Sequence, residues 1–305
     1  MRYAYLGPEG TFTEAAVAGL PEAATIQPVP YPSVGAVLTA VRTGAAERGV
    51  VPVESSVEGI VTATVDDLAG GKDLLIGAET QLSIEFALLA APTATLAGVK
   101  TVGGHPQALP QCRGWLAANL PGYEWVPHAS NAEAARQVAA GNVDAALAGA
   151  FAASTYGLSV LAPDIHDRSN AVTRFLVVTP PGEIPARTRS DRTSLAAFLQ
   201  EDQPGALMEI LTEFAVRGVN LTTIQSRPTG EGLGNYFFFI DCEGHIDDTR
   251  VGEALVGVRR VCAEVRFLGS YPRSDGGRAH VRPGTSNQEF AEALAWLSRL
   301  RFGRV

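Results

Sequence analysis

The 305-residue sequence lacks the features that mark membrane and secreted proteins. No apolar run is long enough to span a bilayer, and the N-terminal stretch MRYAYLG contains no apolar signal core. The three cysteines, Cys112, Cys242 and Cys262, are an odd number without CxxC spacing, which favours buried thiols in a reducing compartment. We therefore expect a cytoplasmic protein without a membrane segment.

Positive charge is also scarce. The formal net charge is −8, so the chain lacks the basic face that a nucleic-acid-binding protein needs. The five histidines are scattered, and none has a second ligand at the spacing of a metal site. No GK[ST] follows the first glycine turn, which excludes a P-loop. An anionic small molecule is still compatible with this composition, because local arginines decide its binding.

The length and the pattern of apolar residues predict more than one domain. Up to residue 179, short apolar strands alternate with helical segments, which predicts mostly parallel sheet with helices on its faces. The expected strands are 2–6, 49–53, 82–90, 99–102, 143–148, 159–161 and 176–178. The first expected helix begins at residue 11. The others cover 33–42, 61–68, 106–119, 130–141 and 151–156.

Polar residues recur where these strands end. They form clusters at residues 7–11, 54–56, 104–105, 130–131 and 170–174. In open α/β sheets, ligands bind at the carboxyl ends of the strands. We infer that two α/β lobes face each other across a cleft and bring these clusters together.

Two of the clusters have the chemistry to bind an anion. Thr11 and Glu14 fit a capping box after a glycine turn, so a helix N-terminus there can attract negative charge, although a plain βα turn fits equally well. Asn170, Thr173 and Arg174 precede an apolar strand, and a guanidinium can hold a carboxylate with two parallel hydrogen bonds. The alternative for this second cluster is a strand that begins with an exposed arginine.

The pattern changes after a Pro-rich linker at residues 180–190. Strands and helices then follow in the order βαββαβ, which is the ferredoxin-like unit. An amphipathic helix over 287–301 comes last, and we expect it to cover a domain or a partner subunit. The predicted domains are therefore 1–179, 191–273 and a tail at 274–305.

Taken together, these motifs resemble prephenate dehydratases with a C-terminal ACT regulatory domain. The resemblance extends from Met1 to about Pro272. It implies an α/β two-lobed catalytic domain like periplasmic binding proteins of type 2, and an α+β ferredoxin-like ACT domain. The strings that carry it are GPEGTF (7–12), VPVESS (51–56), HPQAL (105–109), TRF (173–175), PGAL (204–207) and QSRP (225–228).

The resemblance implies a lyase of L-phenylalanine biosynthesis. Such an enzyme converts prephenate to phenylpyruvate, water and CO2 without a cofactor, and phenylalanine inhibits it at the ACT domain. The expected assembly is a homodimer or homotetramer. Two other functions stay open, an arogenate dehydratase and a non-catalytic cytoplasmic amino-acid sensor. A fused chorismate mutase is not expected, because the dehydratase-like motifs begin at residue 5.

The same resemblance assigns the site residues. Thr173 would lie at the leaving hydroxyl, Arg174 would anchor a carboxylate and Phe175 would form an apolar wall. The other expected substrate-binding residues are Pro8, Thr11, Glu54, Ser55, Ser56, Gly104, His105, Ser130, Asn131 and Asn170. Those expected to bind phenylalanine are Gly205, Ala206, Leu207, Met208, Asn220, Leu221, Gln225, Ser226, Arg227 and Pro228.

Four positions depart from the family pattern. Ser55, Gly104 and Asn131 stand where the family usually has Asn, Ser and Thr. These exchanges alter the number and reach of hydrogen-bonding groups in the expected cleft. Gln225 replaces the usual Glu, which removes a charge beside the expected phenylalanine site.

Overall fold

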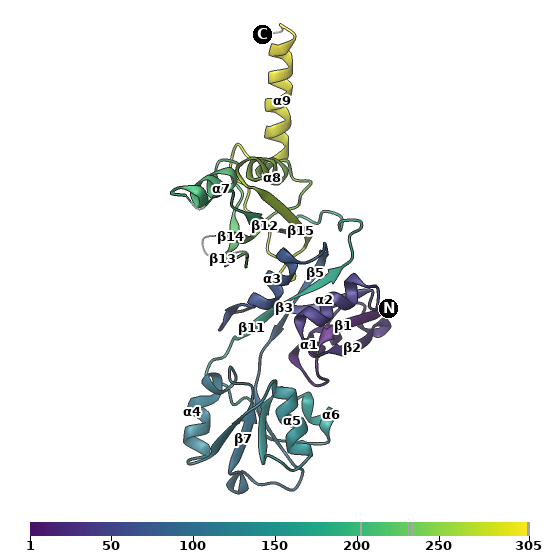
Figure 1. Cartoon of the computed structure of the whole chain (residues 1–305), viewed down its shortest axis with the longest axis vertical. Helices are drawn as coiled ribbons and strands as arrows, with labels where there is room; N and C mark the ends of the chain where they lie inside the picture. The colour runs from purple at the N-terminus through teal and green to yellow at the C-terminus, as the bar shows by residue number, and fades with distance from the viewer. Residues whose placement is uncertain (202, 231, 233–234, 304–305) are drawn as a thin grey trace. The chain divides into compact units, whose positions relative to one another are not determined.

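The computed structural model describes residues 1–201, 203–230, 232 and 235–303, and the chain divides into two compact units (Figure 1). The first unit contains Met1–Thr64 and Thr80–Val178, and the second contains Val65–Glu79 and Thr179–Val305. The sequence indicates the junction near residue 179 but gives no sign that residues 65–79 pack with the C-terminal part. Among the described helices, none has the length and apolar character to cross a membrane.

The first sheet has the strand order β2-β1-β3-β11-β5, and β4 pairs with β3. Its strands are β1 (Arg2–Leu6), β2 (Gln27–Tyr31), β3 (Arg48–Ser55), β4 (Gly59–Ile60), β5 (Leu75–Ser83) and β11 (Val172–Thr179). The associated helices are α1 (Phe12–Ala18), α2 (Val34–Arg42) and α3 (Thr62–Gly70), with a 3-10 turn, η1, at Ala23–Thr25. The helix α2 forms because Ser33 caps it and Val37, Leu38 and Val41 recur on one buried face.

The second sheet has the order β10-β6-β9-β7-β8. Its strands are β6 (Ala87–Ala90), β7 (Thr101–Gly104), β8 (Glu124–Pro127), β9 (Ala145–Ala148) and β10 (Ser159–Ala162). The helices are α4 (Leu109–Asn119), α5 (Asn131–Ala139) and α6 (Ala152–Tyr156), with a 3-10 turn, η2, at Leu96–Gly98. Every residue of β6 and β9 is buried, because alternate side chains enter two separate hydrophobic clusters on the two faces.

Both sheets are mixed, so the prediction of mostly parallel sheet was wrong. β1 runs parallel to β2 and β3, but β11 runs antiparallel to β3. In the second sheet, β7 is parallel to β8 and β9, whereas β6 is antiparallel to both β9 and β10. The reason is the path of the chain. β11 follows the second sheet, and its first residues pair with the last residues of β3, so it enters from the opposite end.

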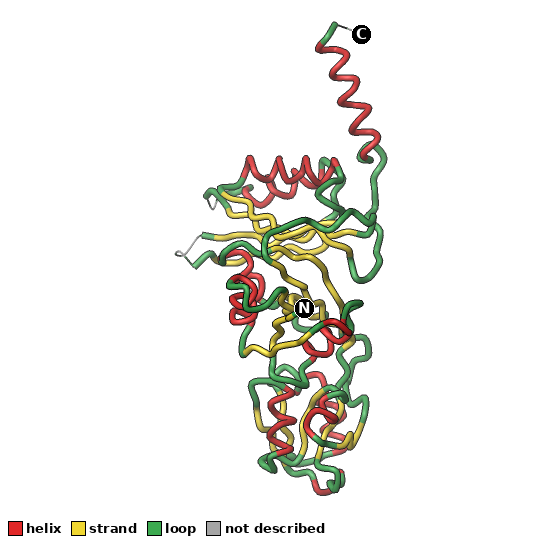
Figure 2. Tube along the Cα trace, turned by 90° about the vertical axis from the view of Figure 1, so that its right-hand side faces the viewer, coloured by secondary structure: helices red, strands yellow, loops and turns green. Residues whose placement is uncertain are grey.

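The second unit contains a four-stranded antiparallel sheet in the order β13-β14-β12-β15. Its elements are β12 (Asp191–Phe198), α7 (Ala206–Ala215), β13 (Leu221–Pro228), β14 (Tyr236–Glu243), α8 (Thr249–Val261) and β15 (Glu264–Pro272). Figure 2 shows both helices over one face of this sheet, where Ile210, Phe214 and Val258 join its hydrophobic core. The predicted βαββαβ order is confirmed.

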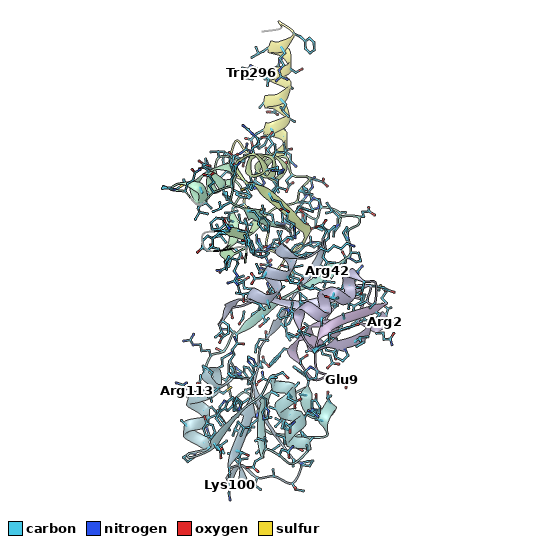
Figure 3. All side chains as sticks on the ribbon, viewed as in Figure 1. Arg2, Glu9, Arg42, Lys100, Arg113 and Trp296 are labelled. Carbon is cyan, nitrogen blue, oxygen red and sulfur yellow. The ribbon has the colours of Figure 1, made fainter. Side chains whose placement is uncertain are left out.

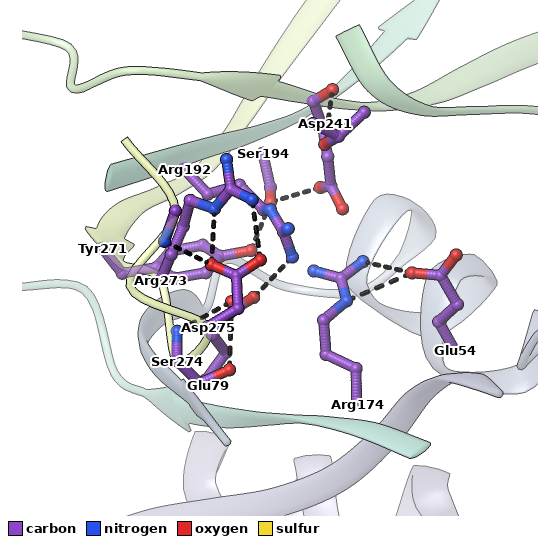
Figure 4. Close-up of polar contacts among 12 residues, drawn as sticks. Glu54, Glu79, Arg174, Arg192, Ser194, Asp241, Tyr271, Arg273, Ser274 and Asp275 are labelled. Atoms are coloured by element: carbon purple, nitrogen blue, oxygen red, sulfur yellow. Dashed lines mark hydrogen bonds and ion pairs between the residues drawn. The ribbon is translucent and has the colours of Figure 1, made fainter. Parts of the chain in front are cut away.

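Residues 65–79 join this unit through buried polar contacts. Arg192 on β12 donates to Glu79 at 2.6 Å, and both side chains are at least nine-tenths buried (Figure 4). Glu79 also accepts from the backbone N–H and the hydroxyl of Ser274. Arg266 adds a hydrogen bond to the carbonyl of Gly71. A buried ion pair with further hydrogen bonds fixes one arrangement of its partners more than it adds net stability.

The C-terminal helix α9 (Asn287–Arg301) begins at a full capping box formed by Ser286 and Glu289. None of its residues is buried, and Figure 3 shows Trp296 projecting from its surface. Its predicted bounds are confirmed, and its start contacts α8, where the Asn287 side chain accepts from the Thr249 N–H at 2.8 Å.

Candidate active site

The first unit contains a cavity of ≈ 480 Å³ between its two sheets, a size that suits a small molecule. Residues from both lobes line it, so the predicted cleft is confirmed. Of the expected substrate-binding residues, it is lined by Thr11, Ser55, His105, Ser130, Asn131, Thr173 and Phe175. Residues that the sequence reasoning missed include Phe12, Thr62, Phe86, Gln107 and Gln111.

Thr173 lies near the start of β11, opposite Ser55 on β3. Ser56 fixes the first residue of β11 with two hydrogen bonds of 2.9 Å. Its hydroxyl accepts from the backbone N–H of Val172, and its own N–H donates to the Val172 carbonyl. The hydroxyl of Thr173 makes no hydrogen bond to another residue in the described part of the chain, and it lines the cavity. It is therefore available to a ligand. Phe175, two residues on, supplies an apolar wall and is itself only 2% exposed.

Arg174 is not where the sequence predicted it. Side chains alternate along a strand, so Thr173 and Phe175 share one face of β11 and Arg174 takes the other. Its side chain is 4% exposed and contacts one carboxylate oxygen of Glu54 through Nε at 3.2 Å and Nη2 at 3.1 Å (Figure 4). Neither Arg174 nor Glu54 lines the cavity. The guanidinium thus grips a carboxylate, but one that belongs to the neighbouring strand.

The second lobe contributes a hydrogen-bonded group of polar residues. Asn131 accepts from the backbone N–H of His105 at 2.8 Å, and Ser130 caps α5 by accepting from the N–H of Glu133 at 3.0 Å. The Nδ1 atom of His105 accepts from the N–H of Gln107 at 3.3 Å. Burial lowers the pKa of His105, and the Glu58 carboxylate opposes this shift. These effects favour a neutral imidazole that carries its proton on Nε2.

Three helix N-termini open into the cavity. Phe12 and Thr13 begin α1, Thr62 and Ala63 begin α3, and Ala132 lies in the first turn of α5. The first backbone N–H groups of a helix have no partner within it, and the helix dipole favours negative charge there. No arginine or lysine is found among the described residues that line the cavity. Carboxylates of a ligand would therefore meet backbone N–H groups rather than side-chain cations.

Aromatic side chains form the apolar part of the cavity. Phe12 packs edge-to-face against Phe86 at 5.5 Å and against Phe151 at 5.4 Å between ring centroids. Phe12 begins α1 in the first lobe, whereas Phe86 and Phe151 belong to the second lobe. The aromatic cluster therefore joins the two lobes. No periodic pattern of apolar residues predicts a role for Phe12, because it is the first residue of α1 and follows a polar turn.

Hydrogen bonds also cross between the lobes. The Tyr156 hydroxyl donates to the carbonyl of Glu9 at 2.6 Å, and Gln107 donates to Glu58 at 3.4 Å. Gly10 is required near the first contact, since its φ is +79° and a Cβ there would lie 2.9 Å from the Tyr156 ring. These contacts hold the lobes together around the cavity.

The remaining predicted substrate residues do not line the cavity. Gly104 is buried under Trp125, Asn170 is exposed in a left-handed turn with φ +83°, and Ser56 serves β11 as described above. Pro8 lies in the half-exposed turn after β1. The residues at these positions therefore serve packing, turns and strand pairing instead of binding a ligand.

The predicted phenylalanine-binding residues occupy two places in the second unit. Gly205 takes a left-handed conformation (φ +96°) before α7, which has no side-chain cap, and Leu207 and Met208 are exposed. The segment Gln225–Pro228 lies on β13, an edge strand of the sheet. There Gln225 donates to the Ser226 carbonyl, and Arg227 forms a bidentate pair with Asp66 at 2.7 and 2.8 Å.

Fold and cavity define a two-lobed α/β ligand-binding domain joined to a ferredoxin-like domain. Family models place both parts, because residues 3–183 match prephenate dehydratase and residues 194–260 match the ACT domain. A prephenate dehydratase of Mycobacterium bovis (strain BCG / Pasteur 1173P2) is 49% identical over 312 residues, which cover 100% of this chain and 95% of the relative. The chain therefore belongs to the prephenate dehydratase family of lyases, which confirms the predicted resemblance.

Solved structures agree with this assignment. The prephenate dehydratase of Arthrobacter aurescens, in complex with L-Phe, has a TM-score of 0.94 at 46% identity, with 98% of this chain and 99% of that chain covered. A protein described as a novel type of quorum-quenching acylase has a TM-score of 0.79 at 28% identity, with 90% and 98% covered.

Proposed function

We propose that the cavity between the two lobes converts prephenate to phenylpyruvate, water and CO2. The observation that carries this proposal is the free hydroxyl of Thr173, which lines an apolar cavity into which helix N-termini open. Prephenate has two carboxylates and a ring hydroxyl, and the cavity offers a matching partner for each. The backbone N–H groups that begin α1, α3 and α5 would take the carboxylates. Phe12, Phe86 and Phe175 would enclose the ring.

The chemistry needs orientation more than a strong acid. The bond to the ring carboxylate breaks and its electron pair enters the ring, while the C–O bond breaks and the leaving oxygen takes up a proton to become water. Thr173 would donate a hydrogen bond to that oxygen as negative charge develops on it. One such positioned donor is worth roughly 10²–10³ in kcat. Arg174 would act indirectly, by pairing with Glu54 across β3 and β11 and so fixing the strand that carries Thr173.

Regulation is proposed at the second unit. Phenylalanine would place its carboxylate at the uncapped start of α7, and the segment Gln225–Pro228 of a second copy would complete the pocket in a homodimer or homotetramer. The relative that was solved with L-Phe supports this proposal. Gln225 lacks the charge of the usual Glu, so we expect weaker control by phenylalanine than that Glu would give. The buried cysteines are consistent with a reducing cytoplasm as the location.

The deciding measurement is phenylpyruvate formation from prephenate by the purified chain, with and without phenylalanine. Turnover that falls as phenylalanine rises supports both assignments. Turnover only with arogenate would change the substrate, and no turnover with either would favour an amino-acid sensor. An acylase is disfavoured, because a hydroxyl nucleophile needs a hydrogen-bonded base, and His105, the histidine that lines the cavity, uses Nδ1 to accept from Gln107.

Thr173→Ala tests the proposed role of the hydroxyl. We expect kcat to fall by about 10² or more, because the departing oxygen loses its donor. The thermal midpoint should be unchanged, since Thr173 makes no hydrogen bond that the variant would remove. Thr39→Ala, on the exposed face of α2, is the matched control and should keep full activity. A Thr173→Ala enzyme with near-normal kcat would exclude this role.

A further inference from the structure

A second cavity, of ≈ 290 Å³, lies within the second unit and has no part in the proposed reaction. Three segments that are distant in the sequence form it. They are the linker before β12, the connection from β14 to α8, and the chain that leads into α9. It shares no lining residue with the start of α7 or with β13. It is therefore distinct from the proposed phenylalanine site.

Positive charge dominates the walls of this cavity. Four arginines line it, Arg187, Arg189, Arg250 and Arg278, against two carboxylates, those of Asp191 and Asp248. Both carboxylates are already used. Asp191 accepts from the Thr188 hydroxyl and from the N–H groups of residues 188 and 189, and Asp248 pairs with Arg187 at 3.0 Å. Arg189 and Arg278 have no side-chain partner in the part of the chain that the structure describes.

Arg250 is the buried member of this set and is 3% exposed. Its Nη1 donates to the carbonyls of Gly218 and His280, and no carboxylate within the described ranges forms an ion pair with it. Gly244 keeps the space beside its Nη2 open, since a Cβ at Gly244 would lie only 3.2 Å from that atom. A buried cation that only carbonyls compensate is costly, and an anion beside it would remove that cost.

We propose that this cavity binds a small dianion through a phosphoryl or carboxylate group. Guanidinium groups suit such a ligand, because each can donate two parallel hydrogen bonds to a pair of oxygens. The cavity is large enough for a ligand of a few non-hydrogen atoms. The ligand would tie the linker and the chain before α9 to the ferredoxin-like domain. This inference does not depend on the proposed dehydratase activity.

Calorimetry on the full chain tests the proposal, with inorganic pyrophosphate and succinate as probes at constant ionic strength set by NaCl. We expect at least one probe to bind once per chain. Binding of pyrophosphate alone assigns a phosphoryl ligand, and binding of succinate alone assigns a carboxylate ligand. Either result supports the site if the variants described next weaken it.

Arg278→Gln removes an exposed, unpaired guanidinium, and Arg189→Gly removes another while relaxing a backbone at φ +76°. Each should weaken binding by about tenfold or more, as expected for a lost charge-assisted hydrogen bond. Arg113→Gln, on α4 (Figure 3), removes an exposed arginine outside the cavity and should bind as the parent does. Binding of neither probe, or equal losses in all three variants, would overturn the proposal.

Discussion

Gly104 shows how one missing side chain accommodates a neighbour. A Cβ at this position would lie 2.7 Å from Cη2 of Trp125, and the indole packs against the core of the second lobe. We predict that Gly104→Ser, which restores the residue usual in the family, destabilises the protein by about 1–3 kcal/mol through overpacking. Urea denaturation measures this change in the free energy of unfolding.

A double variant isolates the cause. Trp125→Phe removes the clashing Cη2 atom, so Gly104→Ser should cost less in that background than alone. If the two changes are simply additive, the clash with Trp125 is not the reason that glycine stands there.

His105 gives a second prediction at the scale of single residues. Burial lowers its pKa below the ordinary value of about 6.5, so the folded chain binds fewer protons than the unfolded chain just below that pH. Stability should therefore fall as the pH falls below about 6.5. His105→Gln should flatten the curve of thermal midpoint against pH between about 7.5 and 5.5.

The exposed His280 provides the control for this titration, because His280→Gln leaves the cavity untouched. The effect of His105 should be modest, since the side chain is half-buried and solvent screens it. If the curves of thermal midpoint against pH stay parallel for the parent and His105→Gln, the titration of His105 does not cause the loss of stability.

Single positions differ in how far the sequence could predict them. Thr173, Ser130 and Asn131 lie at strand or helix ends, and the pattern of elements located them correctly in the cavity. Arg174 and Glu54 have charged groups that could bind a substrate, but neither residue lines the cavity. Strand alternation could have separated Thr173 from Arg174, yet it does not say which of the two faces the cleft.

At the scale of elements, α3 carries residues of both compact units. Thr62 and Ala63 at its start line the cavity, and Asp66, one turn later, holds Arg227 of the segment Gln225–Pro228. We predict that Asp66→Asn keeps kcat but raises the phenylalanine concentration needed for half-inhibition by at least about fivefold, which is the lower range of allosteric coupling. Inhibition curves, together with calorimetry of phenylalanine binding, separate lost coupling from lost affinity.

Asp73→Asn is the matched control, because this exposed aspartate lies in the same segment and no hydrogen bond or ion pair joins it to the described residues of β13. Coupling through α3 would be refuted if Asp66→Asn and the parent were inhibited alike.

The strands that the sequence missed are β2, β4, β5 and β8, and three of them, β2, β5 and β8, lie at the edges of their sheets. β2 contains Pro28 and Pro30, which have no backbone N–H to donate to a neighbouring strand. Because proline is rare in strands, the sequence does not predict a strand here. β8 is half-exposed, and β5 has an irregular burial pattern. The central strands were found because burial on both faces requires a run of apolar residues. The edge strand β10 was also found, because Val160 and Leu161 give it a short apolar segment.

At the scale of the whole molecule, α9 presents apolar side chains that its own chain does not cover. Leu294 and Trp296 are each 55% exposed, and Leu300 is 38% exposed. A helix with an open apolar face is stable when another surface buries it. The proposed homodimer or homotetramer would supply such a surface in a second copy of the chain.

We therefore predict that Trp296→Glu combined with Leu300→Glu, which lie four residues apart on one face of α9, shifts the chain toward smaller assemblies, because charge on this face opposes its burial. Light scattering after size-exclusion chromatography, over a tenfold range of protein concentration, measures the mass. Ala295→Glu places the same charge on a different face of α9 and should leave the assembly unchanged. If the double variant keeps the parent's mass at every concentration, α9 does not hold the copies together, and the sheet edge at β13 becomes the next surface to test.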